Sequence, residues 1–344
     1  MTTPRTDDPL DEVVHAIEGA VEDAVEEPSR YGLRQWSGWV LGPVALLATL
    51  LLPAPAGLSS EGWKTAGAGS LMAILWITEA IPIPATALLP LVLFPLLGLS
   101  NIRDAAAPYA NPVIMLFLGG FIIALAMQKW GLHRRVAVTL IGAMGTRPRR
   151  IILGFLLSST AVSMWVSNTA TALMMLPIAT SVVALLPTDT RRSAALRGFG
   201  TALLLAVAYG STTGGMATLI GTPPNALLAG YMDSVYHREI GFAQWMLLGV
   251  PVTVVTLPVV FFVLTRVSFR LGTAEVPGMK ALLAVERARL GRPGRGEISV
   301  AIVFTLTAVG WIFQPLVARA FPMVSDTTVA MVGALALFVI PVDA

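Results

Sequence analysis

The sequence lacks cysteine altogether and contains only three histidines. Without cysteine, the chain forms no disulfide and offers no thiolate ligand to a metal. His15, His133 and His237 lie in the tail or in loops, too far apart in the sequence to indicate a metal cluster. The apolar runs contain no serine–histidine pair and no paired aspartates, so we do not expect an enzyme.

Charged residues are also scarce, at 12%, whereas hydrophobic residues make up 55% of the chain. Several apolar runs reach about 20 residues, the length of a helix that crosses a bilayer. This composition argues against a soluble protein with a large core and predicts an all-α polytopic membrane protein. The net charge of +3 indicates no nucleic-acid partner, because the basic residues lie in loops between apolar runs, where they encode topology.

Acidic residues are concentrated in the first 28 residues, which carry nine of them. Valine and isoleucine at roughly helical spacing between these acids predict a short amphipathic helix or, alternatively, a disordered arm. The region has no basic segment followed by an apolar run and a cleavage site, so we do not expect a signal peptide. We expect residues 1–35 to be a solvated, cytoplasmic acidic tail without chemistry of its own.

Apolar runs in the first part of the chain predict membrane-spanning helices. The predicted helices cover residues 39–52, 63–82, 85–99 and 112–128. The first of these helices lies within a first transmembrane segment at 36–62. Glu79 is the only acid inside these runs. An intramembrane carboxylate is a functional candidate, but one this close to a helix end more often caps a neighbour or faces lipid headgroups.

Basic residues are distributed unevenly between the loops, and this asymmetry predicts the orientation of the chain. Six of them lie between residues 129 and 150 without any acid, and further clusters follow at 191–197 and 266–295. By the positive-inside rule these stretches are cytoplasmic, including a basic loop at 271–297. We therefore predict a multi-pass protein of the cell inner (plasma) membrane with a cytoplasmic N-terminus.

The apolar segment 151–187 has basic residues at both ends, so it must leave and return on the cytoplasmic side. Two full crossings need about 40 residues plus a loop, and the segment has 37. A re-entrant helical hairpin therefore fits better, with Ser167-Asn168-Thr169 at a tip deep in the membrane. Backbone that is not helical survives at that depth only when it is buried in protein or lines a wet cavity.

The predicted tip offers oxygen atoms without any charged side chain. Ser163, Ser167 and Asn168 would supply hydroxyl, carbonyl and amide oxygens, the hard ligands that an alkali cation prefers. The same turn begins the second helix of the hairpin, with Thr169 and Thr171 in its first turn, and the positive end of the helix dipole favours an anion. One tip can therefore contact both a cation and an anion.

A second apolar stretch, 198–231, is interrupted at 210–225, where four glycines are followed by Pro223-Pro224. These residues cannot form one regular transmembrane helix, and we predict a broken helix of the kind that binds ions in transporters. A phosphate-binding loop is not expected, because the stretch lacks the lysine and serine or threonine that end one. The alternative is a glycine face that lets two helices pack closely. The prolines and Asn225 that follow the glycines favour the break.

Two motifs occur in these segments: Ser167-Asn168-Thr169 in the hairpin, and Gly221-Thr222-Pro223-Pro224-Asn225 in the broken helix. Together they resemble the divalent anion:sodium symporter family, the sodium-coupled dicarboxylate and sulfate carriers. Flanking segments are also typical of that family, and the resemblance runs over residues 63–340. These segments are Trp76-Ile-Thr-Glu-Ala-Ile-Pro82, Leu116-Phe-Leu-Gly-Gly-Phe121 and Met127-Gln-Lys-Trp-Gly-Leu132.

The resemblance implies a secondary active transporter with an inverted-repeat fold, sodium as the coupling ion, no other cofactor and a homodimeric assembly. Its expected substrates are C4-dicarboxylates such as succinate, malate and fumarate. Carried over residue by residue, the sodium ligands are Ser163, Ser167, Asn168 and Gly221. The expected substrate contacts are Ser167, Asn168, Thr169, Thr222 and Pro223.

Neither interrupted segment contains lysine or arginine. A divalent anion there would depend on helix N-termini, amide and hydroxyl donors, and a neighbouring cation. Without such a counter-charge, a dianion in a site of low dielectric constant would be strongly disfavoured, which favours coupling to a cation.

The sequence pattern also predicts two repeats, of which the second is incomplete. A first repeat would cover 63–270, and Gly310-Trp-Ile312 then echoes Leu75-Trp-Ile77. Only 47 residues remain from Ile298, the expected start of the second repeat at 298–344, and they contain no second Ser-Asn-Thr. The alternatives left open are a half-carrier or fragment without transport activity, a sodium-independent dicarboxylate exchanger, and a sulfate carrier.

Overall fold

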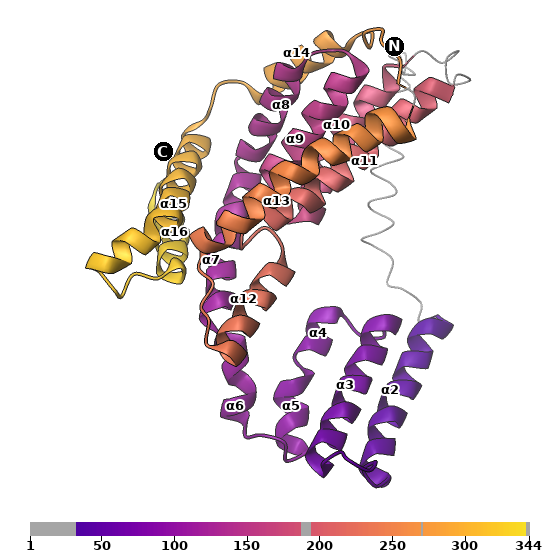
Figure 1. Cartoon of the computed structure of the whole chain (residues 1–344), viewed down its shortest axis with the longest axis vertical. Helices are drawn as coiled ribbons and strands as arrows, with labels where there is room; N and C mark the ends of the chain where they lie inside the picture. The colour runs from indigo at the N-terminus through magenta and orange to yellow at the C-terminus, as the bar shows by residue number, and fades with distance from the viewer. Residues whose placement is uncertain (1–31, 187–193, 270, 342–344) are drawn as a thin grey trace, which may run out of the picture. The chain divides into compact units, whose positions relative to one another are not determined.

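The computed structural model describes residues 32–186, 194–269 and 271–341. The chain divides into two compact units, Met1–Ala110 and Asn111–Ala344. Every regular element among the described residues is helical, which confirms the predicted all-α class (Figure 1). The predicted acidic tail lies outside the described residues except for its last four positions, which already lead into the first helix.

The first unit is built on two helices of equal length that pack along each other. Close approach is possible because small residues face the partner helix: a Cβ atom on Gly67 would lie only 1.9 Å from Thr49 Oγ1. Leu71 and Leu75 form the apolar centre of this unit. Its helices are α2 (Leu33–Leu51), α3 (Ser60–Thr78), α4 (Ile83–Ala87), α5 (Leu89–Leu96) and α6 (Ile102–Ala106), followed by the 3-10 turn η1 (Ala107–Ala110).

The run at 85–99 was predicted as one helix, and the structure divides it into α4 and α5 at Leu88. The physical reason is Pro90, which has no N–H to donate and whose ring conflicts with the carbonyl group four residues earlier. The predicted helix 63–82 also ends early, at Thr78, because Glu79 takes a left-handed conformation with φ of 50° as its C-cap.

Glu79 has a structural role in this unit. Its carboxylate lies 2.6 Å from Arg34 Nη2 on α2, and the Arg34 Nε also donates to the carbonyl oxygen of Thr78. Both charged side chains are more than half exposed, so the ion pair contributes little to stability. The side chain of Glu79 therefore forms an exposed ion pair with the neighbouring helix and does not cap it.

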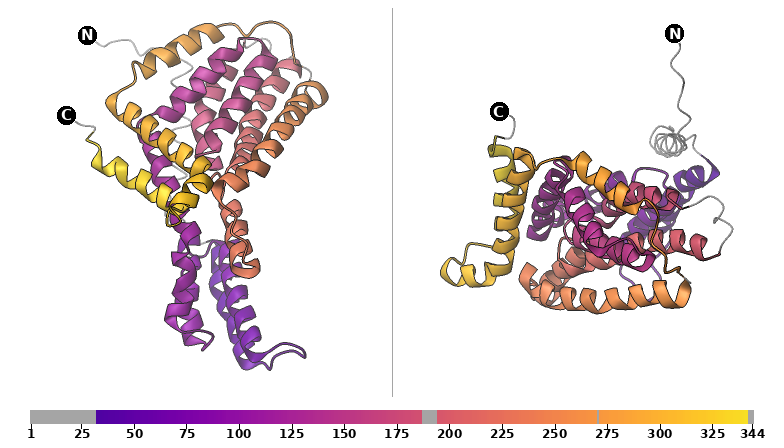
Figure 2. Two further views of the ribbon diagram at one scale, coloured as in Figure 1. Left: turned by 60° about the vertical axis from the view of Figure 1, so that its left-hand side comes forward. Right: turned by 90° about the horizontal axis from the view of Figure 1, so that it is seen from above.

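The core of the second unit lies between four consecutive helices. Ile141, Phe155, Met175 and Leu203, one from each helix, belong to the same fully buried apolar cluster. The packing of these helices can be followed in Figures 1 and 2. They are α8 (Leu132–Met144), α9 (Pro148–Ser163), α10 (Asn168–Ala184) and α11 (Ala194–Ala217), and α7 (Pro112–Lys129) precedes them.

The remaining helices of the second unit include one that was not predicted. The predicted basic loop at 271–297 contains α14, whose Leu283 and Glu286 are buried against the rest of the unit. A high content of arginine favoured a loop, but the spacing of the buried residues is helical. These helices are α12 (Pro223–Tyr236), α13 (Phe242–Phe262), its π-helical continuation η3 (Val263–Ser268), α14 (Met279–Leu290), α15 (Arg295–Ala320) and α16 (Asp326–Val339).

Three helices in the described part of the chain are long and apolar enough to cross a membrane: Pro112–Lys129, Phe242–Ser268 and Arg295–Ala320. The helix α2, predicted as the first transmembrane helix, is not among them. Its first turns carry Arg34, Gln35 and Ser37, so its apolar part is too short. Helices α9 and α10, at 16 and 17 residues, are also shorter than the 20 or so that a full crossing requires.

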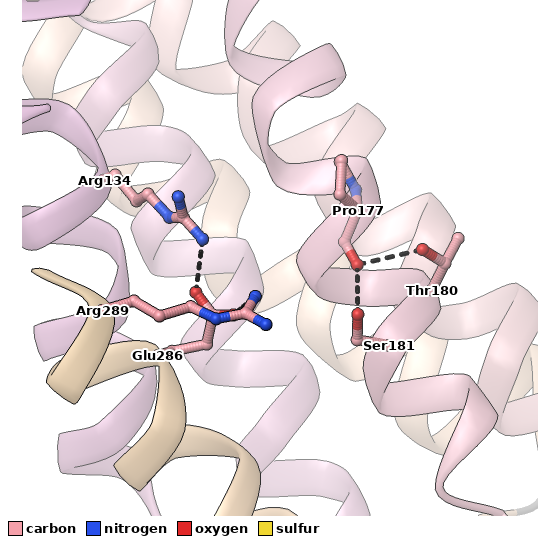
Figure 3. A network of polar contacts seen from close by, with 6 residues as sticks. All are labelled: Arg134, Pro177, Thr180, Ser181, Glu286 and Arg289. Carbon is pink, nitrogen blue, oxygen red and sulfur yellow. Dashed lines mark hydrogen bonds and ion pairs between the residues drawn. The ribbon is translucent and has the colours of Figure 1, made fainter. Parts of the chain in front are cut away.

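Buried carboxylates hold α8 against α14 and α15. Arg134 pairs with Glu286 of α14 at 2.6 Å, as Figure 3 shows, and Glu286 also lies 3.4 Å from Arg289. Arg135 forms a two-pronged pair with Glu297 in the first turn of α15, with Nη2 2.8 Å from Oε2. Both glutamate side chains are about nine-tenths buried, so these pairs are shielded from water.

The Glu297→Gln substitution should lower the free energy of unfolding by about 2 kcal/mol, because it removes a charged acceptor that two Arg135 donors share. Thermal unfolding of the purified protein in detergent would show a lower midpoint. The matched control is Asp233→Asn, an exposed carboxylate without an ion pair in the described residues, which should leave the midpoint unchanged. Equal midpoints for the two variants would contradict this account.

Candidate functional site

The Ser-Asn-Thr motif lies at a turn between two helices. Helix α9 ends at Ser163, residues 164–167 form the turn, and α10 begins at Asn168. Ser167 is the N-cap of α10, and its hydroxyl oxygen accepts a hydrogen bond from the backbone N–H of Ala170 at 3.3 Å. This helix–turn–helix agrees in position with the predicted hairpin, and its re-entry into a membrane remains a prediction.

The Gly-Thr-Pro-Pro-Asn motif lies at a break between α11 and α12. Helix α11 ends at Ala217, residues 218–222 are not helical, and α12 begins at Pro223. Two adjacent prolines cannot supply the N–H groups that would continue α11, but they fit the first turn of a new helix. The predicted broken helix is therefore present, with the break confined to five residues.

The glycines before the break form a packing face for another helix, which was the alternative interpretation of this stretch. A Cβ atom on Gly210 would lie 2.7 Å from the carbonyl oxygen of Leu156, and one on Gly214 would lie 2.3 Å from that of Thr160. Both acceptors belong to α9, so these glycines let α11 lie directly against the first helix of the hairpin. The break and the packing face coexist, carried by different residues.

The tip and the break meet at Gly215. A Cβ atom at this position would lie 2.2 Å from Asn168 Oδ1, and a Cβ atom on Gly221 would lie 2.6 Å from the carbonyl oxygen of Gly215. Asn225 of α12 completes the contact, since its Nδ2 donates to the carbonyl oxygens of Gly215 and Thr218, each at 2.8 Å. Glycine at position 215 therefore allows the first residue of α10 and the break to lie against each other.

A group of oxygen atoms surrounds Ser163, which is fully buried. Its Oγ lies 2.8 Å from Asn168 Oδ1 and 2.6 Å from the backbone oxygen of Ser211, and it is in donor position toward both. A serine hydroxyl has only one hydrogen, so it cannot satisfy both acceptors at once. An arrangement of several oxygens that share one proton is well suited to an alkali cation.

Buried hydroxyl groups on neighbouring turns lack hydrogen-bond partners in the described part of the chain. They belong to Thr171, one turn beyond Asn168 on α10, to Ser211 of α11, and to Ser159, one turn before Ser163. A buried polar atom without a partner is costly and calls for an ion or a water molecule. Their chemistry fits a cation better than an apolar ligand.

The other predicted contacts lie nearer the surface. Ser167 and Thr222 are half-buried, whereas Thr169 and Pro223 are exposed. The structure thus brings Ser163, Asn168 and Gly221 together through Gly215. No hydrogen bond in the described residues joins the hydroxyl of Thr169 or Thr222 to this group.

Several residues of the site were not predicted from the sequence. They include Gly215 at the point of contact and Ser211 with its carbonyl oxygen. Asn225, which the sequence already associated with the break, orders it through two hydrogen bonds. Thr218 also contributes, because its hydroxyl donates to the carbonyl oxygen of Met164 in the turn. A usable signal was the spacing of four between Ser211 and Gly215, which places both residues on one face of a helix.

Aromatic side chains fix the turn against α13 and α15. The ring of Trp165 stacks on Phe242 at 6.1 Å and on Trp311 at 6.4 Å, and Phe242 and Trp311 stack on each other at 4.6 Å. Asp326 accepts a hydrogen bond from the backbone N–H of Phe242 at 2.6 Å, which ties the start of α13 to the start of α16. The tip is therefore supported by a rigid apolar layer.

The electrostatics of the site come from helix ends and uncharged oxygens. Neither Asn168–Ala184 nor Pro223–Tyr236 has an acidic or basic residue in its first turn, so the positive ends of both helices are uncompensated. The described residues contain no group of three histidine, aspartate or glutamate side chains that could hold a metal ion.

Comparison with known proteins places the chain in a family. A family model described as "Sodium:sulfate symporter transmembrane region" matches residues 33–343. The sodium-dependent dicarboxylate transporter SdcS of Staphylococcus saprophyticus is 40% identical over 323 residues, which cover 92% of this chain and 62% of the relative. The SdcS of Staphylococcus aureus (strain bovine RF122 / ET3-1) is 38% identical over 314 residues, covering 89% and 60%.

The chain spans about three fifths of the length of the curated relatives it matches. Those relatives are named as transporters, in agreement with the prediction that the chain is not an enzyme. The match at 33–343 and the three long apolar helices also agree with a multi-pass membrane protein. The chain belongs to the sodium:sulfate symporter family, the divalent anion:sodium symporters that its Ser-Asn-Thr and Gly-Thr-Pro-Pro-Asn motifs resemble.

Proposed function

We propose that this chain acts in the sodium-coupled transport of small divalent anions, with C4-dicarboxylates such as succinate, malate and fumarate as substrates. The observation that carries the proposal is the convergence of Ser163, Asn168 and Gly221 at Gly215. This convergence joins the end of one helix pair to the break in another, and it does so with uncharged oxygen atoms. Such a meeting of a helix tip and a broken helix is how many transporters bind their ions.

Sodium is held, in this proposal, by the hydroxyls of Ser163 and Ser167, the amide oxygen of Asn168 and the carbonyl oxygen of Gly221. Support comes from the oxygens that share one proton around Ser163. The buried hydroxyl of Thr171, one turn further along α10, adds to the local excess of oxygen. No carboxylate is available within either segment, so the bound ion keeps its full positive charge.

The anion binds beside this charge, at the starts of α10 and α12. Ser167, Asn168 and Thr169 lie at the first start, and Thr222 and Pro223 at the second. Their partly exposed positions suit a ligand that arrives from water. Because neither segment contains lysine or arginine, sodium and the two helix N-termini together supply the counter-charge. Binding of the anion is therefore coupled to binding of sodium, since the negative charge of a dianion would be uncompensated without the cation.

The names of the relatives support dicarboxylates as substrates, and the description of the family supports sulfate as a second candidate. Both are divalent anions and need the same counter-charge. We place the chain in the plasma membrane as a homodimer with a cytoplasmic N-terminus. Within it, the part that contains the hairpin moves against a fixed scaffold during transport.

Proteoliposomes that contain the purified protein should take up radiolabelled succinate when sodium is supplied outside and not when it is replaced by potassium. An excess of unlabelled malate should compete, and competition by sulfate would show that it shares the site. Equal uptake with and without sodium would reject coupling and favour a dicarboxylate exchanger. Sodium binding without any uptake would favour a half-carrier.

The Asn168→Ala and Ser163→Ala substitutions should each weaken sodium binding at least about tenfold, because each removes an oxygen ligand of a charged ion. The measurement is a binding isotherm with radioactive sodium on the purified protein. Ser181→Ala is the matched control. This hydroxyl, shown in Figure 3, lies more than three turns along α10 from Asn168 and donates to the carbonyl oxygen of Pro177. Normal sodium affinity in the first two variants would overturn the assignment.

A further inference from the structure

A basic cavity lies at the end of α9 opposite to the tip. It occupies about 450 Å³ between the α8–α9 connection and α14. The charged residues in its lining are four cations and a single acid: Arg147, Arg150, Lys280, Arg287 and Glu275. The 16 residues of α9 span about 24 Å, so this cavity is separate from the proposed sodium and substrate site.

Two glycines of the α8 end shape the cavity around two of the arginines. A Cβ atom on Gly142 would lie 2.3 Å from Arg287 Nη2, so the guanidinium of α14 rests directly on this glycine. Gly145 has a φ of 100°, a conformation that other residues rarely adopt, and the Arg150 side chain passes 3.6 Å from its Cβ position. The loop before α14 is held in place by a hydrogen bond from the Val276 N–H to the carbonyl oxygen of Thr146 at 3.0 Å.

The cations of this cavity differ from other arginines on the same helices. Arg134 and Arg289 are compensated by the buried carboxylate of Glu286 (Figure 3). Arg135 is compensated by that of Glu297. By contrast, none of the four cations in the cavity forms an ion pair within the described residues. All four are exposed, and an anion held between them would relieve their mutual repulsion.

The start of α9 adds to the positive potential. Its N-cap is Arg147, which contributes no side-chain hydrogen bond, and its first turn contains no acid. Pro148 follows at the first helical position, so the unpaired N–H groups of this helix end belong to the next residues, including Arg150. The dipole of the helix and the guanidinium groups therefore act on the same region.

We propose that this cavity binds a phosphate group, carried either by the headgroup of an anionic lipid or by free phosphate. A phosphate presents several strong acceptor oxygens, and guanidinium groups match its geometry with paired N–H donors. The volume admits a phosphate together with part of its carrier. Basic residues beside membrane helices attract anionic lipids, each contributing to the affinity.

The test compares the protein with the double variant Arg150→Gln plus Arg287→Gln, reconstituted in nanodiscs of phosphatidylcholine with or without phosphatidylglycerol. Native mass spectrometry counts the phosphatidylglycerol molecules that stay bound, and calorimetry in detergent measures inorganic phosphate. Each basic residue near an anionic membrane contributes about fivefold to binding, so the double variant should bind about 30-fold more weakly. Retention of lipid alone assigns the site to headgroups, and binding of inorganic phosphate assigns it to the free anion.

The matched control is Arg266→Gln plus Arg292→Gln, which removes the same charge from exposed arginines that neither line the cavity nor form an ion pair in the described residues. This control should bind phosphatidylglycerol and phosphate as the unaltered protein does. An equal loss of binding in both double variants would show that the effect comes from general surface charge and would overturn the proposal. Unchanged binding in both variants would overturn it as well. If the cavity variant does not fold, by circular dichroism and gel filtration, Lys280→Gln with its exposed side chain replaces it in the same comparison.

Discussion

The missing side chain at Gly215 is the constraint on which the candidate site depends. Two segments far apart in sequence approach the same backbone position, and a single methyl group there would overlap with Asn168. Gly221 approaches the same peptide, and Asn225 hydrogen-bonds to it. Because all these contacts converge on one residue, the geometry of the tip and the geometry of the break are not independent. Any change in one alters the oxygen atoms that the other presents.

This shared geometry is the physical basis on which the proposed site would bind ions without charged side chains. Buried oxygens around Ser163 outnumber the protons available to them, which favours a cation, and two uncompensated helix starts favour an anion. The apolar layer of Trp165, Phe242 and Trp311 keeps the turn in place. A site of this kind binds either ion weakly alone and both ions better together, which is the physical basis of the coupling that we propose.

Much of this arrangement could be predicted from the sequence because it depends on local signals. Basic residues on both sides of 151–187 predicted a hairpin at the position where α9 and α10 meet, and Pro223-Pro224 predicted the break before α12. The partner of Asn168 could not be predicted, since Gly210, Gly214 and Gly215 are equivalent by composition and only packing selects the last. Helix α14 was missed for a related reason: its burial depends on Arg134 pairing with Glu286, a contact between distant parts of the chain.

The central claim is that close contact at Gly215 creates the cation site. The most direct measurement is the sodium-binding isotherm of a Gly215→Ala variant beside Gly230→Ala, since a Cβ atom on Gly230 would meet nothing within 4 Å. The account predicts that Gly215→Ala loses sodium binding at concentrations that saturate the unaltered protein, whereas Gly230→Ala binds normally. Unaltered sodium affinity in a folded Gly215→Ala variant would contradict it.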